Sequence, residues 1–260
     1  MAEFSTVLYQ QRGHVAVITL NRPDKLNTFN QALCDDLAGA VTLATEDESV
    51  RAILLCGAGK HFSAGADLNS KFEEGYTVED SLNENFKPTL LALWNTPKPV
   101  ISAVNGSASG VGSSFVLVSD IALMAEDAYL YMAFMPIALV PDGGATWQLV
   151  RQLGHKRAYE FIVGAKKVGA ETCVEWGLAN RVVPAAELFD EALQLAETLA
   201  SAAPRAVGMV KGLLHQGIHT DLGDAISLEA KAQLALFGAE DNLEGITAFF
   251  EKRKPKFSGR

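Results

Sequence analysis

Two glycine-rich loops in the 260-residue sequence have residue types suited to holding a negatively charged oxygen. Residues 63–68 (SAGADL) follow one short apolar stretch, and residues 105–112 (NGSASGVG) follow another. Glycine lets another backbone approach closely, and the second loop runs into a helix, whose first N–H groups point outward. Two such loops on neighbouring strands would aim two amides at one oxygen, forming an oxyanion hole. The spacing fits ordinary strand-to-helix turns as well, so both interpretations stand at this point.

A single acidic residue, Asp142, follows a proline and precedes two glycines and an apolar stretch. This position suits a helix N-cap. It also suits a proton-transfer group, because a dry pocket raises the pKa of a carboxyl toward neutrality. Rival motifs fail: Phe115 stands where a dinucleotide fingerprint needs glycine, and Ala108 where a nucleophile elbow needs serine. A P-loop needs a hydroxyl residue after Lys60, where His61 stands.

The elements that must position these loops alternate between strands and helices. Apolar patterns predict strands at 14–20, 52–56, 100–104 and 121–125, and helices that include 30–46 and 113–119. This alternation predicts an α/β fold with parallel strands. Beyond Asp142 the only strand candidate is 181–183, and helices are expected at 188–200, 204–216, 222–237 and 242–252. We therefore expect an α/β core over residues 1–200 and a helical region over residues 201–260.

Composition excludes several functional classes. The net charge of −9 argues against a nucleic-acid partner, because phosphate binding needs a cationic surface. No apolar run reaches the roughly 20 residues that a membrane span needs, and neither a metal cluster nor a nicotinamide motif is present. The three cysteines are scattered, which favours a reducing cytoplasm. The basic tail over residues 252–260 fits either a solvated helix end or a small polyphosphate site.

Ordered motifs over nearly the whole chain resemble the crotonase superfamily, the enoyl-CoA hydratases and isomerases. The matching segments are LNRP (20–23), LN (26–27), FSAGADL (62–68), AVNG (103–106), SDIA (119–122), VPDGG (140–144), GLANRVV (177–183) and FEKRKP (250–255). The resemblance implies a crotonase-like core of ββα repeats with a helical C-terminal trimerisation region. It also implies a homotrimer or hexamer that binds an acyl-CoA thioester. No separate cofactor is expected, because coenzyme A is part of the substrate.

By this resemblance the oxyanion donors are the backbone N–H groups of Ala66 and Val111. The family usually has glycine at the second position, and the β-branched Val111 restricts that loop. Further substrate or CoA contacts are expected at Lys25, Leu26, Ala64, Asp67, Leu68, Gly110, Ser114, Phe134 and Phe257. From residue type alone, Asp67 is expected to cap a following helix, Ser113 and Ser114 to cap the helix that they begin, and His61 to lie in a surface turn.

The acid–base positions favour one reaction within the family. Hydratases carry two glutamates, at the positions of Ser114 and Phe134, and neither residue here can exchange a proton usefully at neutral pH. Asp142 aligns with the acid of several isomerases and a dehalogenase. We therefore expect an enoyl-CoA isomerase that moves a 3-ene to the 2-ene, with Asp142 as the single acid–base. The alternatives are a hydratase using Asp142 and Ser114, a CoA-linked epoxide isomerase, a dehalogenase and a non-catalytic acyl-CoA binding protein.

Overall fold

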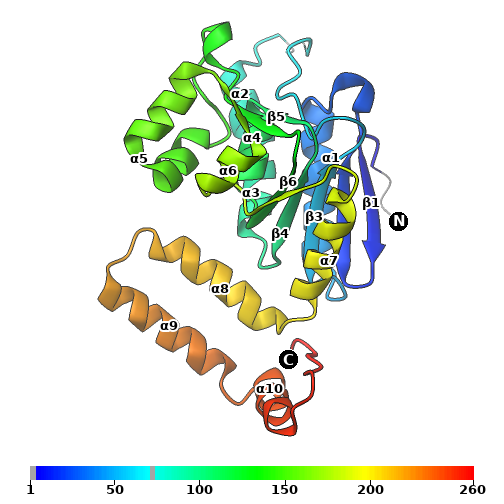
Figure 1. Ribbon diagram of the computed structural model, residues 1–260, viewed down its shortest axis with the longest axis vertical. Coiled ribbons are helices and arrows are strands. Elements are labelled where there is room, and N and C mark those ends of the chain that lie inside the picture. The colour runs from blue at the N-terminus through cyan, green and yellow to red at the C-terminus, as the bar shows by residue number, and fades with distance from the viewer. Residues whose placement is uncertain (1–3, 71–73) are drawn as a thin grey trace.

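A computed structural model describes residues 4–70 and 74–260, and its centre is a six-stranded sheet (Figure 1). The strands lie in the order β1 (Val7–Arg12), β2 (Val15–Leu20), β3 (Ala52–Gly57), β4 (Val100–Val104), β6 (Ile121–Ala125) and β9 (Arg181–Val183). Only β1 is antiparallel to its neighbour, and the other pairs are parallel. β3 and β4 are buried on both faces, which explains their continuous apolar sequences.

A second, three-stranded sheet stands beside the first. It consists of β5 (Ser107–Ser109), β7 (Tyr129–Tyr131) and β8 (Lys167–Gly169), with β7 between the other two. The chain passes from β4 into β5 through Asn105 and Gly106. Gly106 has φ +57°, and a Cβ there would lie 2.2 Å from the Lys60 carbonyl oxygen, so only glycine fits this turn. The turn carries the chain from the carboxyl end of the main sheet into the second glycine loop.

Ten α-helices occur among the described residues. They are α1 (Gln31–Glu46), α2 (Val78–Ser81), α3 (Lys87–Asn95), α4 (Val111–Leu117), α5 (Ala145–Gly164), α6 (Ala170–Glu175), α7 (Leu188–Ala200), α8 (Pro204–Gly217), α9 (Leu222–Leu236) and α10 (Glu240–Glu251). In Figure 1, α7 lies in front of the main sheet and α1 behind it, so both faces are covered. The α1 helix begins where the Asn30 side chain accepts a hydrogen bond from the Leu33 amide at 3.0 Å.

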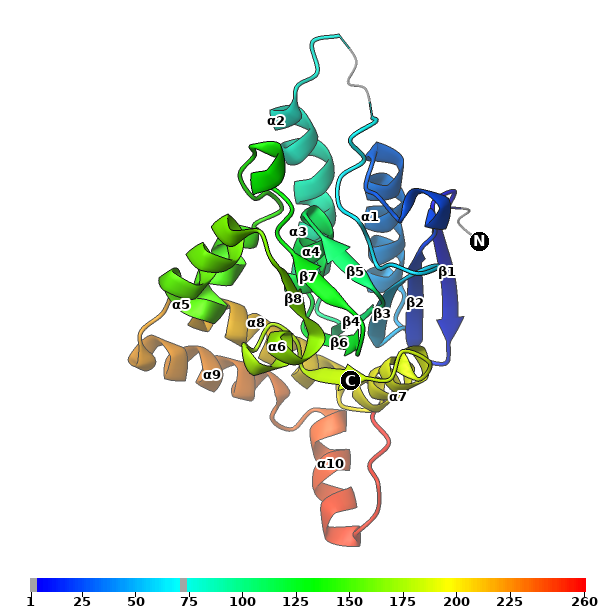
Figure 2. The same ribbon diagram turned by 45° about the horizontal axis from the view of Figure 1, so that its top comes forward.

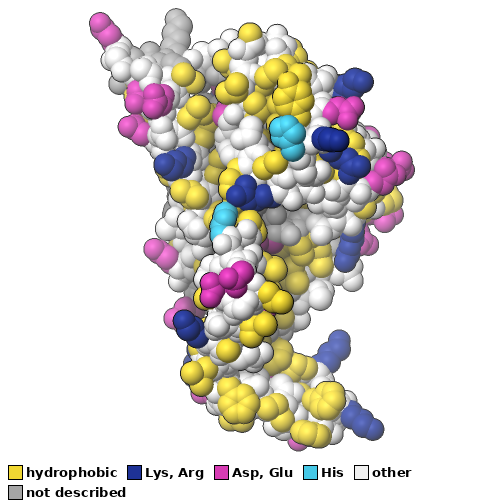
Figure 3. All heavy atoms as spheres, turned by 90° about the vertical axis from the view of Figure 1, so that its left-hand side faces the viewer, with side chains coloured by type: hydrophobic (Ala, Val, Ile, Leu, Met, Phe, Trp, Pro, Cys, Tyr) yellow, Lys and Arg dark blue, Asp and Glu magenta, His cyan; other side chains and the backbone are white. Residues whose placement is uncertain are grey.

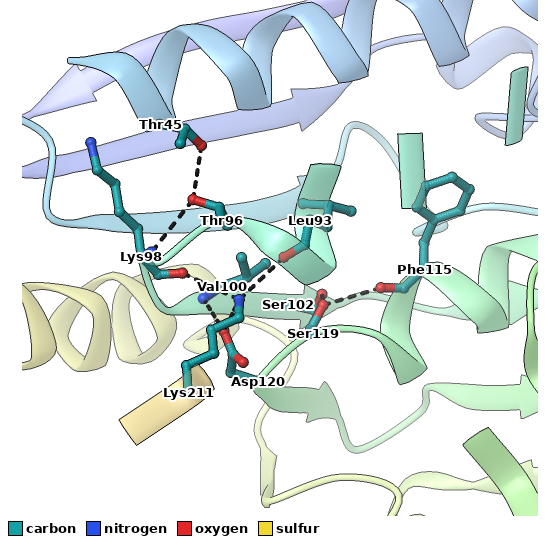
Figure 4. A network of polar contacts seen from close by, with 10 residues as sticks. All are labelled: Thr45, Leu93, Thr96, Lys98, Val100, Ser102, Phe115, Ser119, Asp120 and Lys211. Carbon is teal, nitrogen blue, oxygen red and sulfur yellow. Dashed lines mark hydrogen bonds and ion pairs between the residues drawn. The ribbon is translucent and has the colours of Figure 1, made fainter. Parts of the chain in front are cut away.

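The last three helices project away from the sheets (Figures 1 and 2). α8 is tied to the core by Lys211, whose Nζ donates to the Leu93 carbonyl at 3.1 Å and lies 2.8 Å from an Asp120 carboxylate oxygen (Figure 4). The same Asp120 oxygen accepts the Val100 amide at the start of β4. A buried ammonium ion needs such partners, because its desolvation is otherwise costly.

The structure confirms most of the predicted elements and corrects two. It adds β1, which the sequence analysis did not predict. Residues 181–183 are not the only strand beyond Asp142, because 167–169 form β8. The predicted loop 105–112 also contains a strand, β5, and its helix begins at Val111 rather than at Ser113. Both missed segments are three residues long, too short to show a periodic pattern. Helix α7 ends at Ala200, and the division of the chain into two domains there stays a prediction.

Candidate active site

The two glycine loops touch each other at Gly65 and Gly110. A Cβ at Gly65 would lie 2.8 Å from the Ser109 carbonyl oxygen, and one at Gly110 would lie 3.8 Å from the Gly65 Cα. Ser63 bridges the loops, because its amide donates to the Ser107 carbonyl (3.0 Å) and its carbonyl accepts the Ser109 amide (2.9 Å). The loops therefore lie side by side, and the next amides along them belong to Ala66 and Val111.

The orientation of the Ala66 amide follows from its neighbours. The Gly65 carbonyl accepts the Phe29 amide at 2.8 Å, and the Asp67 amide donates to the Phe29 carbonyl at 2.8 Å. Groups at alternate positions of an extended chain point to opposite sides, so the Ala66 N–H points away from Phe29. Within residues 4–70 and 74–260 no protein acceptor meets this N–H. It is thus available to a bound oxygen.

Val111 is the first residue of α4, and Gly110, at φ +52°, is its N-cap. The first amides of a helix have no intrahelical acceptor. Among the described residues the Val111 N–H meets none elsewhere either. The β-branched side chain fits because residue 143 is a glycine: a Cβ there would come within 3.1 Å of the Val111 Cγ2. Gly143 therefore gives the branched residue its space at this loop.

Contacts of Ser114 with Asp142 and Gly143 hold Asp142 beside the second glycine loop. The Ser114 Oγ donates to the Asp142 main-chain carbonyl at 3.1 Å, and a Cβ at Gly143 would lie 2.7 Å from the Ser114 Cβ. The Asp142 carboxyl oxygen Oδ1 is buried and has no hydrogen-bond partner in the described part of the chain. This burial raises the pKa of Asp142 from 3.8 to about 6, partly offset by its own backbone amide. Such a carboxylate can accept and return a proton near neutral pH.

Aromatic side chains pack beside both glycine loops. Phe29, next to the Ala66 loop, stacks on Phe115 of α4 with ring centroids 4.1 Å apart. Phe134 is buried, and its ring lies 3.9 Å from a Cβ placed at Gly110. The Phe29–Phe115 stack joins the segment beside the first loop to α4, and Phe134 places an apolar ring beside Gly110. The structure thus brings together Ala66, Gly110, Val111, Ser114, Phe134 and Asp142.

Three capping roles expected from residue type are wrong. Asp142 does not cap α5, whose N-cap is Gly144 and lacks a side-chain hydrogen bond. Ser113 and Ser114 donate to carbonyls instead, Ser113 to Ala108 at 2.6 Å. Asp142 thus precedes the cap position, and both serines lie inside α4, where a hydroxyl faces carbonyls rather than free amides.

Asp67 forms an ion pair rather than capping a helix, because no helix follows it directly among the described residues. Its carboxylate lies 3.0 Å from Arg22 Nη2 and accepts the Asn69 amide. Although burial opposes it, these hydrogen bonds and charges lower the pKa of Asp67. Arg22 also donates to the Thr28 carbonyl. The pair therefore closes residues 22–28 against the first glycine loop.

The remaining binding candidates near this loop lie at its rim. Leu26 is half-exposed, and its carbonyl accepts the Ala64 amide at 2.9 Å; Lys25 and Leu68 are exposed. Beneath them the buried Asn27 side chain donates to the Ala58 and His61 carbonyls. The sequence does not reveal these roles of Asn27 and Arg22, because the Ala58, His61 and Asp67 groups that they bind lie more than 30 residues away. Lys25, Leu26, Ala64, Asp67 and Leu68 thus share one side of the candidate site.

The structure gives the surroundings of two further candidates, Phe257 and His61. Phe257 lies against Gly245 of α10, beside Phe249 and Phe250, so a single chain does not bring it to the glycine loops. His61 is part-buried, and a contact holds its ring in place, because its Nδ1 lies 3.1 Å from the Ser107 hydroxyl.

In the basic tail, Arg253 forms ion pairs with Glu244 at 2.6 Å and with Glu251 at 2.5 Å, so its charge is balanced within the chain.

Among residues 4–70 and 74–260, no group of three or more His, Cys, Asp or Glu side chains is arranged to hold a metal ion. Over the same ranges no helix has the length and apolar character needed to cross a bilayer.

Comparison with known proteins agrees with the fold. Residues 10–260 match the family model described as enoyl-CoA hydratase/isomerase. A probable enoyl-CoA hydratase of Rhodobacter capsulatus is 38% identical over 99% of both chains. The 1,2-epoxyphenylacetyl-CoA isomerase of Escherichia coli is 36% identical over the full length of both. A crystal structure of an enoyl-CoA hydratase from Bacillus anthracis has a TM-score of 0.93 and 33% identity, covering 98% of this chain and 100% of that one.

A family match over nearly the whole chain, with relatives above 30% identity, defines the class. The protein is an enzyme of the crotonase type. It belongs to the enoyl-CoA hydratase/isomerase family.

Proposed function

We propose that the protein isomerises the double bond of a 3-enoyl-CoA to give the 2-enoyl-CoA, with Asp142 as the only acid–base. The observation that carries the proposal is the Asp142 carboxyl group next to the Val111 loop: its Oδ1 is buried without a hydrogen-bond partner in the described residues, and Ser114 and Phe134 stand where other carboxylates could have been. One carboxylate suffices for moving a proton between two carbons. Activating a water in the manner of the two-glutamate hydratases needs a second one.

The reaction follows from these groups in two steps. The Asp142 carboxylate removes a proton from the carbon next to the thioester carbonyl, and the C–H electron pair moves onto the carbonyl oxygen. The Ala66 and Val111 amides hold that oxyanion. The charge then returns through the conjugated system, and the protonated Asp142 delivers the same proton two carbons further along, which leaves the conjugated 2-ene. No other reactant is consumed.

The test is an assay with a 3-enoyl-CoA in which the conjugated thioester absorbance rises as product forms. Asp142→Asn should lower the rate by about 10²–10⁴-fold, the usual contribution of a general acid–base. Asp190→Asn, the same change at an exposed position of α7, serves as the matched control. Rapid conversion of a 2-enoyl-CoA to the 3-hydroxy product by the wild-type protein would instead identify a hydratase, the name that several relatives carry.

A second candidate is a CoA-linked epoxide isomerase, favoured by the 36% identity to the E. coli 1,2-epoxyphenylacetyl-CoA isomerase. It would use the same oxyanion donors and the same acid–base. Consumption of an epoxide thioester, combined with inactivity toward 3-enoyl-CoA, would select this alternative.

We also propose that the chain assembles as a homotrimer or a hexamer. The helices α8–α10 expose large apolar side chains (Figure 3), and such contiguous patches mark interaction surfaces. Those more than half exposed include Val210, Leu214, Leu222, Ile226, Leu234, Phe237, Leu243, Phe249 and Phe250. A second copy of the chain would cover them.

A further inference from the structure

A cavity of about 360 Å³ begins one residue beyond Asp142, between α3, the end of α4 and the start of α5. Its size lies near the lower end of small-molecule pockets, which span roughly 300–1,000 Å³. The lining is almost entirely apolar and consists of Leu82, Leu90, Leu91, Trp94, Val118 and Trp147, with Gly143 and Gly144 at one end. Lys87 and Gln148 supply its polar groups.

Two tryptophans form one wall of this cavity, and both are fixed by neighbours. The indoles of Trp94 and Trp147 meet edge to face, with centroids 5.5 Å apart and planes at 89°. His215 of α8 stacks on Trp94 at 3.6 Å, and the Arg151 guanidinium lies 3.9 Å from the Trp147 ring. These contacts restrict the rotation of both indoles, so the wall presents a rigid aromatic surface.

Three leucines, Leu82, Leu90 and Leu91, also line the cavity, and a local distortion of the helix places the first of them. Residues 82–86 form a π-helical turn in which the Lys87 amide donates to the Leu82 carbonyl. Pro88 explains the distortion, because it has no N–H and its ring displaces the carbonyl four residues earlier. The widened turn brings Leu82 to the cavity together with Leu90 and Leu91 of α3.

The cavity adjoins the candidate active site at Gly143. This glycine lines the cavity, and it packs so closely against the Val111 and Ser114 side chains, beside the second oxyanion amide, that a Cβ would not fit between them. A single residue thus separates the cavity from that amide, and the acyl group of a thioester held at the amide would lie beside the cavity. The inference that follows thus depends on the proposed acyl-CoA function.

We propose that this cavity is an acyl-group pocket that prefers a planar aromatic ring over saturated groups of the same carbon number. An aromatic ring pairs favourably with a fixed indole, edge to face or offset, beyond the area that it buries. That additional contribution corresponds to a difference of about 2- to 12-fold in affinity. A saturated ring or a linear chain gains only from burial of apolar surface.

The test measures binding, so that it is separate from turnover. Dissociation constants of the full-length protein are determined by calorimetry for phenylacetyl-CoA, cyclohexylacetyl-CoA and octanoyl-CoA, none of which carries the double bond to be shifted. The first two have the same carbon skeleton and differ only in aromaticity. We expect the wild-type protein to bind phenylacetyl-CoA about 2- to 12-fold more tightly than cyclohexylacetyl-CoA.

Variants of Trp94 and Trp147 test whether these two side chains cause the preference for the aromatic ring. Trp94→Leu and Trp147→Leu should each reduce this ratio toward one. Trp176→Leu, which removes a partly buried tryptophan outside the cavity, should retain it. Thermal melting checks each variant for folding. If one of the wall variants does not fold, the wild-type ratio and the other variant still decide the question.

The outcomes distinguish the aromatic preference of the pocket from the acyl-CoA function on which it depends. Equal or weaker binding of phenylacetyl-CoA by the wild type would overturn the aromatic preference, as would a ratio that survives in both wall variants. Failure of all three thioesters to bind would instead contradict the proposed acyl-CoA function. Binding without preference, together with Asp142-dependent isomerisation, would refute only the pocket assignment.

Discussion

Replacing Asp142 by asparagine is expected to remove a pH-dependent loss of stability from the folded protein as well as its activity. The carboxyl group is buried without a partner for Oδ1, and its pKa is raised from 3.8 to about 6. A raised pKa means that the folded state binds the proton more tightly than the unfolded state does. Wild-type stability should therefore fall as the pH rises from about 4 to about 6 and stay lowered above that.

The magnitude follows from the size of the shift. A change from 3.8 to about 6 is about two units, and each unit corresponds to about 1.4 kcal/mol. The full effect is about 3 kcal/mol, of which a little over 2 kcal/mol falls between pH 4 and pH 7, so the free energy of unfolding of Asp142→Asn relative to wild type should rise by about 2 kcal/mol over that range. The comparison across pH removes the constant cost of burying an amide, which does not titrate in this range.

The assay is equilibrium unfolding in guanidinium chloride at several pH values from 4 to 7.5. Protein concentration is held fixed, because subunit association would add to the measured stability. Asp190→Asn, at an exposed site, should show no comparable change in the difference. If the difference in the free energy of unfolding between Asp142→Asn and wild type does not change with pH, the reasoning is refuted. If the stability of Asp142→Asn relative to wild type falls as the pH rises, the folded protein stabilises this carboxylate.

Four other predictions follow from the same structure. The wild-type kcat/KM for isomerisation should fall as the pH drops through about 6, because Asp142 must be deprotonated to act as a base; a rate independent of pH over that range would contradict this role. Gly65→Ala should remove measurable activity, because its φ of +103° and a Cβ 2.8 Å from the Ser109 carbonyl force the loops apart; wild-type kcat/KM would refute their close approach. Lys211→Ala should lower the free energy of unfolding by about 1–2 kcal/mol, because the buried Leu93 carbonyl and the part-exposed Asp120 carboxylate lose the ammonium group as a partner; no measurable loss would count against this contact. Phe249→Asp should shift the protein to a smaller species in analytical ultracentrifugation, and an unchanged sedimentation coefficient would remove α10 from the interface.

The sequence alone determined the alternation of elements and the approximate place of the chemistry. The buried strands 52–56, 100–104 and 121–125 could be read because their apolar runs are bounded by charge and glycine. The two loops at the ends of these strands could be recognised because glycine-rich segments are typical of tight turns and of places where two backbones approach closely. Short segments failed: the strand at 167–169 has too few residues for a period to show.

Only the tertiary structure decided the surroundings of Asp142 and Asp67. Both fit a helix cap by residue type, since a cap depends on local sequence, yet their contacts lie far along the chain. Ser114 meets Asp142 across 28 residues, and Arg22 meets Asp67 across 45. Likewise, the tryptophan wall joins residues 94 and 147 from different helices. Local patterns record how the backbone folds near a residue, whereas burial and long-range partners, which set the pKa and the shape of a pocket, exist only once the chain has packed.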